Sequence, residues 1–245
     1  MWPVCLDEVA GVGVDVLKWF GYTIFMDTGC AGCKDCNCGH SDLPVFTGSQ
    51  KSLWEKTAQA PSFKALSGDL DVDVVVIGGG ITGLTTAYLL LQAGKKVAVV
   101  EAAKLGMGVT GYTTAHITEQ LDIFFTDLIR RFGKKQARLV ADSSREAIAT
   151  IERLSRALNL QADFERVPGY LYSESEHDVE FLKAEAQAAQ SLGVAVEFVK
   201  DVPLPFATVG AVKFNNQAQF HPLKYIYGIA EHINQHGGHV FENTR

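Results

Sequence analysis

The stretch VDVVVIGGGITG, residues 72–83, decides how this chain folds. Its first half is a short apolar run rich in β-branched residues, which is typical of a strand buried on both faces of a parallel sheet. Its second half has the glycine spacing G-x-G-x-x-G from Gly78 to Gly83. A helical pattern then continues to about Gln92, where Gly94 can cap the C-terminal end. The sequence therefore predicts a strand, a glycine turn and a helix in direct succession.

A second predicted strand, residues 96–101, completes a βαβ unit. The usual right-handed crossover would place both strands in one sheet. In this context each glycine has a physical role. Gly78 permits a tight turn, Gly80 lets the backbone approach a pyrophosphate, and Gly83 lets the helix pack closely on the strand. The unit is therefore predicted to bind a dinucleotide.

The start of the helix and the end of the second strand complete the predicted site. Ile81 and Thr82 lie at the helix N-terminus, where free N–H groups meet the phosphate charge. Glu101 can accept hydrogen bonds from the adenosine ribose hydroxyls, and its charge would repel the 2′-phosphate of NADP. The glycines do not distinguish NAD from FAD, because both bind this fold. The alternative is a glycine-rich turn in another α/β protein, with Glu101 merely exposed.

The composition excludes several classes of protein. Of the 245 residues, 47% are hydrophobic and 20% are charged, so the chain can bury a core and is not disordered. A net charge of −6 argues against nucleic acid as a partner. Acidic residues interrupt the N-terminal apolar run, and glycines break the uncharged stretch 74–91. We therefore predict no signal peptide, no membrane span and a cytoplasmic location.

The rest of the chain alternates between helical and strand patterns. Residues 102–118 are rich in Gly and Thr and are predicted to form a loop. A long helical region follows from Glu119 to about Leu158, with a break near Gly133. Next come two short predicted strands around Pro168-Gly169 within 164–173, a helix over 176–192 and a strand over 194–199. The last predicted elements are a strand or hairpin arm over 209–220, a helix from Pro222 to about Gln235 and a strand over 239–242. His221 precedes this last helix as a cap or turn residue.

Composition divides the chain into three parts. Residues 1–43 are an extension that holds all five cysteines, residues 44–71 are a lead arm that packs on a neighbouring body, and residues 72–245 are an incomplete cofactor domain with inserted helices and part of a second domain. Four of the cysteines are close enough to suggest zinc or an iron–sulfur cluster. They are Cys30, Cys33, Cys36 and Cys38. Their intervals fit neither the ferredoxin nor the Rieske pattern, so we favour an extension without a metal site.

The run from Val74 to Glu101, followed by LGMGVTGYTTA at residues 105–115, resembles the D-amino-acid oxidase/glycine oxidase superfamily of FAD-dependent oxidoreductases. Three further stretches resemble a bacterial subgroup that often carries a C-terminal Rieske domain. These are residues 163–172, 219–223 and 237–244. The resemblance covers about residues 43–245. It implies an α/β protein with a Rossmann-like FAD-binding βαβ core and part of a second, α+β, substrate-side domain.

The resemblance also implies residue roles. The glycine turn would hold the FAD pyrophosphate, Glu101 would hold the ribose, and the loop after the second strand would run beside the pyrophosphate and flavin. The loop residues concerned are Thr110, Gly111, Tyr112, Thr113 and Thr114. A Gly/Thr segment there supplies free N–H groups and hydroxyl donors, although a solvated loop is the alternative. We assign no catalytic residue, because the family's substrate-carboxylate groups would lie in a half that this chain lacks.

The implied parent reaction is the oxidation of an amine or amino acid. Hydride passes from the carbon that bears nitrogen to flavin N5, and the imine then hydrolyses. The Rieske resemblance implies an electron-acceptor partner. Family members are about twice as long, so we interpret the chain as the N-terminal half of an oxidoreductase, truncated and inactive alone. Two other hypotheses stay open at this point: a NAD-linked dehydrogenase or reductase module, and a non-catalytic nucleotide-binding fragment.

Overall fold

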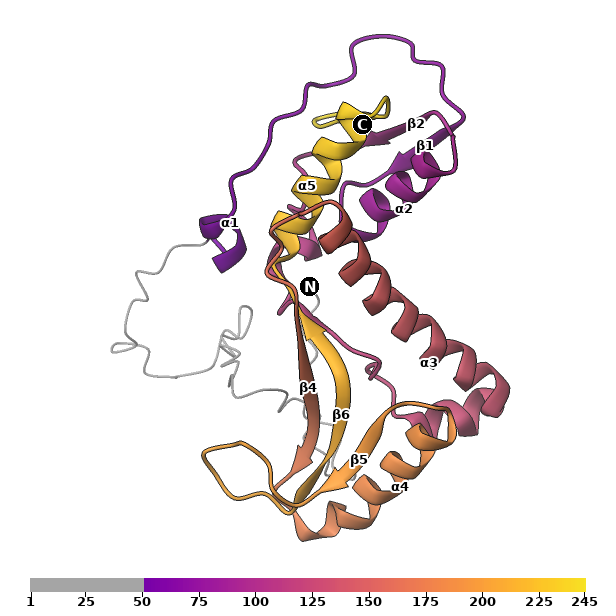
Figure 1. The fold of residues 1–245 in the computed structure, drawn as a ribbon, viewed down its shortest axis with the longest axis vertical. Coiled ribbons are helices and arrows are strands. Elements are labelled where there is room, and N and C mark those ends of the chain that lie inside the picture. The colour runs from indigo at the N-terminus through magenta and orange to yellow at the C-terminus, as the bar shows by residue number, and fades with distance from the viewer. Residues whose placement is uncertain (1–50) are drawn as a thin grey trace, which may run out of the picture.

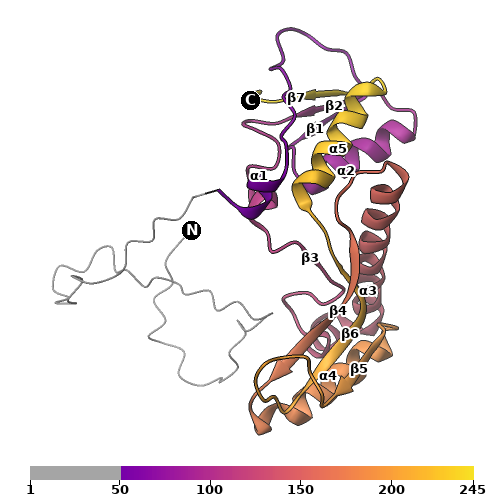
Figure 2. The same cartoon turned by 60° about the vertical axis from the view of Figure 1, so that its left-hand side comes forward.

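The computed structural model describes residues 51–245 as two bodies joined end to end (Figures 1 and 2). One end holds a three-stranded parallel sheet with two helices. The other end holds α4 (Val179–Ser191) and β5 (Val196–Val199). Between the two ends, in both views, run α3 (Phe125–Ala157), β4 (Glu165–Ser173) and β6 (Gly210–Gln219). This arrangement confirms the predicted fold class, a Rossmann-like core with part of an α+β second domain.

The parallel sheet has the order β1-β2-β7, so the last strand of the chain lies beside the second. Its elements are β1 (Val74–Ile77), β2 (Val97–Val100) and β7 (His239–Phe241), and its covering helices are α2 (Ile81–Gln92) and α5 (Pro222–Gln235). Side chains alternate along each strand, so only one set faces the helices. Val97, Val99 and Val240 are buried in that core together with apolar residues of both helices. The predicted βαβ unit is therefore present.

The other face of this sheet is only partly covered. Val75 is 54% exposed and Ile77 is 87% exposed. The prediction of a strand buried on both faces is thus wrong for β1 within residues 51–245. The physical reason is that α2 and α5 both pack on the opposite face, while the described segment 66–72 lies over part of this one.

The second sheet is built around the long strand β6 (Gly210–Gln219). β4 (Glu165–Ser173) pairs with it on one side, and both β5 (Val196–Val199) and β3 (His116–Ile117) pair with it on the other, all antiparallel. Two helices cover this sheet, α3 (Phe125–Ala157) and α4 (Val179–Ser191). The 3-10 turn η2 (Glu176–Asp178) directly precedes α4. A second apolar core lies between these helices and the sheet.

The long helix α3 begins six residues later than the sequence pattern suggested and bends where predicted. Gly133 interrupts it with φ +78°, which confirms the predicted break. The predicted start at Glu119 is wrong, because two contacts hold that residue outside the helix. Its backbone N–H donates to Gln217 Oε1, and its buried carboxylate pairs with Arg145 at 3.0 Å. The helix instead starts where the carboxylate of Glu185 accepts hydrogen bonds from its first amides.

Residues 165–173 form one strand rather than two. β4 pairs with β6 along its whole length, and the register shifts between Val167 and Gly169. Pro168 has no N–H to give to the ladder, and the bulge at this point lies in β6, where Asn215 and Asn216 together face this one residue of β4. The predicted loop 102–118 likewise contains two short elements, the 3-10 helix η1 (Val109–Tyr112) and strand β3.

The segment before the parallel sheet contains one short helix that the sequence analysis did not predict. Helix α1 spans Leu53–Thr57 and is followed by extended chain. That chain runs beside the end of β7, where Phe63 N–H donates to the Glu242 carboxylate at 3.3 Å. Leu66 N–H donates to Thr244 Oγ1 at 3.0 Å.

Candidate cofactor site

The glycine turn connects the C-terminal end of β1 to the N-terminus of α2. Gly78 has φ +105°, a backbone conformation that favours glycine. A Cβ atom on Gly83 would overlap the carbonyl oxygen of Gly78, so only glycine lets α2 lie this close to β1. Gly80 is the N-cap of α2 and makes no side-chain capping bond. Gly80 has no side chain that could cap the first amides of α2, and one of them, Ile81 N–H, donates to the Thr110 hydroxyl of the following loop.

Glu101 follows β2 and lies against this turn. Its Oε2 accepts a hydrogen bond from Gly79 N–H at 2.8 Å, and its Oε1 accepts one from Ala103 N–H at 2.9 Å. Each carboxylate oxygen has a second lone pair, so both oxygens can still accept a hydroxyl donor. Gly106 N–H also donates to Gly79 O at 3.1 Å. The acid, the turn and the following loop thus form one connected unit.

Residues 105–115, which we call the cofactor loop, lie beside the glycine turn. Thr110 Oγ1 is 3.4 Å from Ile81 N, and a Cβ atom on Gly80 would be 3.2 Å from that same hydroxyl oxygen. The loop is closely folded, because a Cβ on buried Gly111 would approach Gly106 O to 2.6 Å. The structure therefore brings the hydroxyl of Thr110 to the start of α2.

The other predicted loop residues are placed differently. The side chain of Tyr112 is 58% exposed, and Thr114 is also exposed. Thr113 uses its hydroxyl locally, since Oγ1 accepts from Ala115 N–H at 3.2 Å. The structure thus gathers Thr110 and Gly111 at the turn, whereas Tyr112 and Thr114 face outward.

Three residues of this region carried no functional assignment from the sequence. Glu242 follows β7, is only 2% exposed, and accepts from Leu105 N–H at 2.9 Å and from Lys104 Nζ at 2.7 Å. Sequence reasoning could have found Glu242 from its position directly after a predicted strand, because the carboxyl ends of parallel strands lie together at one edge of the sheet. Trp54 contacts the loop from α1, and no pattern near it indicated this.

Ala115, the third of these residues, closes the cofactor loop in a strained conformation. It is buried and has φ +63°, which is uncommon for a residue with a Cβ atom. Its carbonyl oxygen accepts from Phe220 N–H at 3.4 Å, and β3 begins at the next residue. Such strain persists only where surrounding structure fixes the backbone, so the end of the loop is held by its neighbours.

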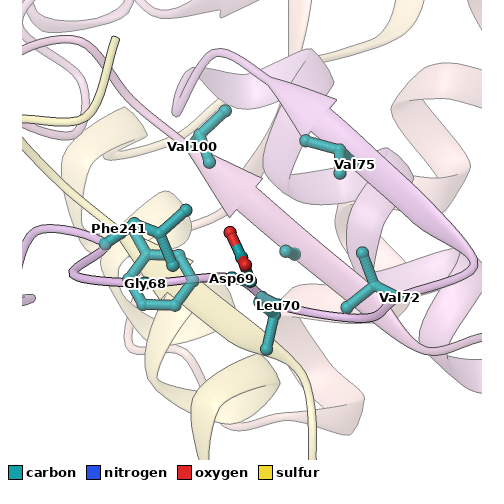
Figure 3. Close-up of a pocket in the computed structure, with 9 residues that line it drawn as sticks. Gly68, Asp69, Leu70, Val72, Val75, Val100 and Phe241 are labelled. Carbon is teal, nitrogen blue, oxygen red and sulfur yellow. The ribbon is translucent and has the colours of Figure 1, made fainter.

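A separate hollow lies on the face of the parallel sheet that points away from α2 and α5, and it does not belong to this site. It has a volume of about 210 Å³ and lies between the extended segment 66–72 and the exposed face of the three strands (Figure 3). Val75, Val100 and Phe241 form its sheet side. None of the residues that line it belongs to the glycine turn or the cofactor loop.

The histidines and cysteines give mixed outcomes. His221 caps α5 as predicted, since its side chain accepts from Lys224 N–H. Burial lowers the pKa of His221 and of His116.

The four clustered cysteines, Cys30, Cys33, Cys36 and Cys38, lie outside the described residues. Within residues 51–245, no group of three or more His, Cys, Asp or Glu side chains is arranged to hold a metal ion. No helix in this same part of the chain is long and apolar enough to cross a membrane.

Comparison with known proteins decides the family. Residues 73–245 match the family described as "DAO: FAD dependent oxidoreductase", and this match covers most of the chain. The chain belongs to this family. Membership confirms the recognised superfamily and selects FAD over NAD as its cofactor.

Two curated relatives and one solved structure illustrate the match. The Bacillus subtilis (strain 168) protein YhfW, named as a Rieske 2Fe-2S iron-sulfur protein, is 38% identical over 194 residues, which are 79% of this chain and 38% of YhfW. Gamma-glutamylputrescine oxidoreductase of Escherichia coli (strain K12) is 26% identical over 74% of this chain and 43% of its own length. The crystal structure of glycine oxidase from Geobacillus kaustophilus shares the fold, with a TM-score of 0.58 and 17% identity, over 70% of this chain and 46% of that one.

The chain therefore spans less than half the length of these proteins. Its glycine turn nevertheless fits the family cofactor. Gly80 places no side chain over the turn, Ile81 N–H at the start of α2 meets the hydroxyl of Thr110, and Glu101 supplies acceptors for hydroxyl groups. These groups fit the adenosine and pyrophosphate part of a DAO-family FAD site.

Proposed function

We propose that this chain supplies the adenosine- and pyrophosphate-binding part of a DAO-family oxidoreductase that oxidises an amine or an amino acid. One observation carries the proposal: the glycine turn, the start of α2 and the Glu101 carboxylate form one connected unit. The same unit explains why backbone groups, rather than basic side chains, would bind an anionic cofactor in a chain of net charge −6.

In this proposal the ligand groups are divided along the chain. The amides that follow Gly80, at Ile81, Thr82 and Gly83, bind the pyrophosphate together with the positive end of the α2 dipole. The carboxylate of Glu101 accepts the ribose hydroxyls. Thr110 donates its hydroxyl to a phosphate oxygen from the opposite side of the turn, and Gly111 keeps the loop close to it.

The remaining loop residues would lie farther along the cofactor. Thr113 and Thr114 would offer backbone N–H groups and hydroxyls beside the flavin, and the exposed ring of Tyr112 would pack against a ring of the cofactor. FAD, when bound, supplies an acceptor for the hydride of the carbon that bears nitrogen. The protein would orient the substrate and exclude water there.

The substrate class is supported by the names of related proteins. One curated relative is named for a glutamylated amine, and a structure with the same fold is a glycine oxidase. The relative named as a Rieske protein supports an iron–sulfur partner as the electron acceptor. We propose a cytoplasmic location for the protein, consistent with the small polar substrates of this class.

The proposal is tested on a tagged copy purified from its native host, so that natural partners stay attached. After release from the protein, the bound nucleotide should be FAD rather than NAD. Anaerobic addition of amines and amino acids should bleach the flavin absorbance, whereas the hydroxy acid lactate should not. A protein that retains NAD instead, or a flavin reduced by lactate but by no amine, would overturn the proposal.

A matched pair of variants links this result to the site. Glu101→Gln removes the charge at the ribose position, whereas Glu231→Gln removes an exposed charge on α5. The first should release FAD during purification and the second should not. Equal retention by the two variants would contradict the role of Glu101.

A further inference from the structure

Helix α1 has only five residues, too few to be stable in water on its own. A capping box begins it: Glu55 N–H donates to Ser52 Oγ at 3.2 Å, and Ser52 N–H donates to Glu55 Oε2 at 2.9 Å. Such a cap stabilises the start of a helix, but it does not offset the cost of nucleating one. Contacts with the rest of the molecule must therefore hold α1 in place.

Helix α1 contacts both the cofactor loop and α5. The indole Nε1–H of Trp54 donates to the carbonyl oxygen of Thr113 at 2.8 Å. The same indole meets the ring of His221 edge-on, with the ring centroids 4.9 Å apart. Trp54 thus bridges the cofactor loop and the N-terminus of α5.

The bonds around His221 fix its protonation state. Lys224 N–H donates to Nδ1 at 3.3 Å, so Nδ1 carries no proton. Nε2 therefore carries the proton of the neutral ring and donates to Thr57 Oγ1 at 2.9 Å. The Thr57 hydroxyl in turn donates to Leu53 O at 2.7 Å. Each donor in this chain of bonds has one acceptor, so α1 and α5 are joined without an unsatisfied group.

We infer that α1 is a clasp for the cofactor loop, in which Trp54 is a positioning residue and His221 is its anchor. The inference rests on the proposed FAD site. Residues 53–57 precede the part of the chain that matches the family model, residues 73–245.

The clasp acts on the part of the loop between Gly111 and the buried Ala115. Within residues 51–245 the Thr113 hydroxyl accepts from the nearby Ala115 N–H, and the neighbouring side chains of Tyr112 and Thr114 are exposed. Trp54 therefore supplies a long-range bond that fixes the Thr113 carbonyl. Ordering the loop before the ligand arrives lowers the entropy lost on binding. FAD should accordingly bind more tightly to the clasped loop.

The test compares Trp54→Phe with Leu53→Ala in the full chain. Phenylalanine keeps an aromatic ring beside His221 but cannot donate to Thr113. Leu53 lies on the same helix and is exposed, so it is the matched control. Thr57→Val is a second variant, which breaks the link from α1 to His221 and leaves the indole bond intact. Hydrogen exchange of residues 105–115 without FAD reports the clasp, and the FAD dissociation constant reports its consequence.

We expect Trp54→Phe to speed exchange of the loop amides about fivefold to tenfold, to raise the dissociation constant of FAD by a similar factor, and to leave exchange in α3 unchanged. Leu53→Ala should match the wild type, and Thr57→Val should be intermediate. Unchanged loop exchange in Trp54→Phe would overturn the clasp, whether or not FAD binds. Faster exchange with unchanged FAD affinity would overturn its role toward the cofactor. A wild-type chain that binds no FAD, with a loop still loosened by Trp54→Phe, would overturn the proposed function and that role together.

Discussion

The indole N–H of Trp54 donates to the carbonyl oxygen of Thr113 at 2.8 Å, although 59 positions separate the two residues in the chain. This bond joins a segment outside the family match to the loop that follows the second strand of the dinucleotide fold. The loop in turn contacts the glycine turn through Thr110 and Gly106. The candidate site is therefore one connected set of backbone and side-chain bonds, and each part of it can be tested separately.

Gly83→Ala should destabilise the protein and prevent FAD binding. The new Cβ would overlap the Gly78 carbonyl, a backbone atom that cannot move aside like a side chain. Separation of α2 from β1 should cost about 1–3 kcal/mol, as overpacking does. Thermal unfolding and equilibrium dialysis with FAD measure the two effects. The control is Gly68→Ala, whose Cβ meets nothing within 4 Å. Equal melting temperatures for the two variants would contradict the close packing.

Glu101→Gln should raise the FAD dissociation constant by about 10- to 100-fold, since a charged hydrogen-bond acceptor is worth about 1.5–3 kcal/mol. The amide that replaces the carboxylate has only one acceptor oxygen, so either Gly79 N–H or Ala103 N–H loses its partner. Fluorescence titration with FAD measures the change. With Glu231→Gln as the control, an affinity for FAD that falls equally in both variants would argue against a specific role.

Glu185→Gln should destabilise the second body without altering the FAD site. The Glu185 carboxylate is fully buried and accepts from Thr126 N–H at 3.0 Å and from Thr126 Oγ1 at 2.9 Å at the start of α3. Replacing a buried, charged cap by an amide should cost about 1–3 kcal/mol. Urea unfolding measures it, with exposed Glu180→Gln as the control. Identical unfolding midpoints for the two variants would show that α3 does not depend on this cap.

Acid should weaken the protein partly through His221. Burial first, and then the Lys224 ammonium, lower its pKa below the ordinary 6.5, while the Asp163 carboxylate opposes this shift. The unfolded chain therefore binds the proton more readily. The neutral ring contributes its full stability above pH 6.5, and this contribution falls as the pH drops from 6.5 toward the folded pKa.

His221→Asn isolates that contribution, because asparagine is a good N-cap and does not titrate. The free energy of unfolding is measured by urea at pH 7.5 and about pH 5. The wild type should lose more stability between the two pH values than the variant does. His116 and His232, whose pKa values burial also lowers, titrate in both proteins and so cancel in the comparison. A steeper loss in His221→Asn would contradict the assignment.

Local pattern was sufficient for the elements and for part of the site. The apolar run before Gly78 and the spacing to Gly83 predicted β1, the turn and α2, because strand, turn and helix are set by neighbouring residues. His221 before Pro222 likewise predicted the cap of α5. Gly133 predicted the bend of α3, since a left-handed backbone there favours glycine.

Contacts between distant residues account for what the sequence did not predict. The start of α3 depends on Glu185, a residue of α4, and the exclusion of Glu119 depends on Gln217 and Arg145. The buried position of Glu242 depends on a parallel pairing between β2 and β7 that spans most of the chain. The bond from Trp54 to Thr113 has no local signal either. In each case the residue that completes the contact is distant in the chain and is brought close by tertiary packing. A pattern of neighbouring residues in one sequence does not identify such a partner.

The most direct test of the central claim is the nucleotide that the full 245-residue chain binds. Parallel titrations with FAD and with NADH, on the wild type and on Gly83→Ala, separate the cofactor from the fold. We predict that the wild type binds FAD at least tenfold more tightly than NADH, and that Gly83→Ala loses this binding. Tighter binding of NADH, or equal FAD affinity in the two proteins, would contradict an FAD site built on the glycine turn.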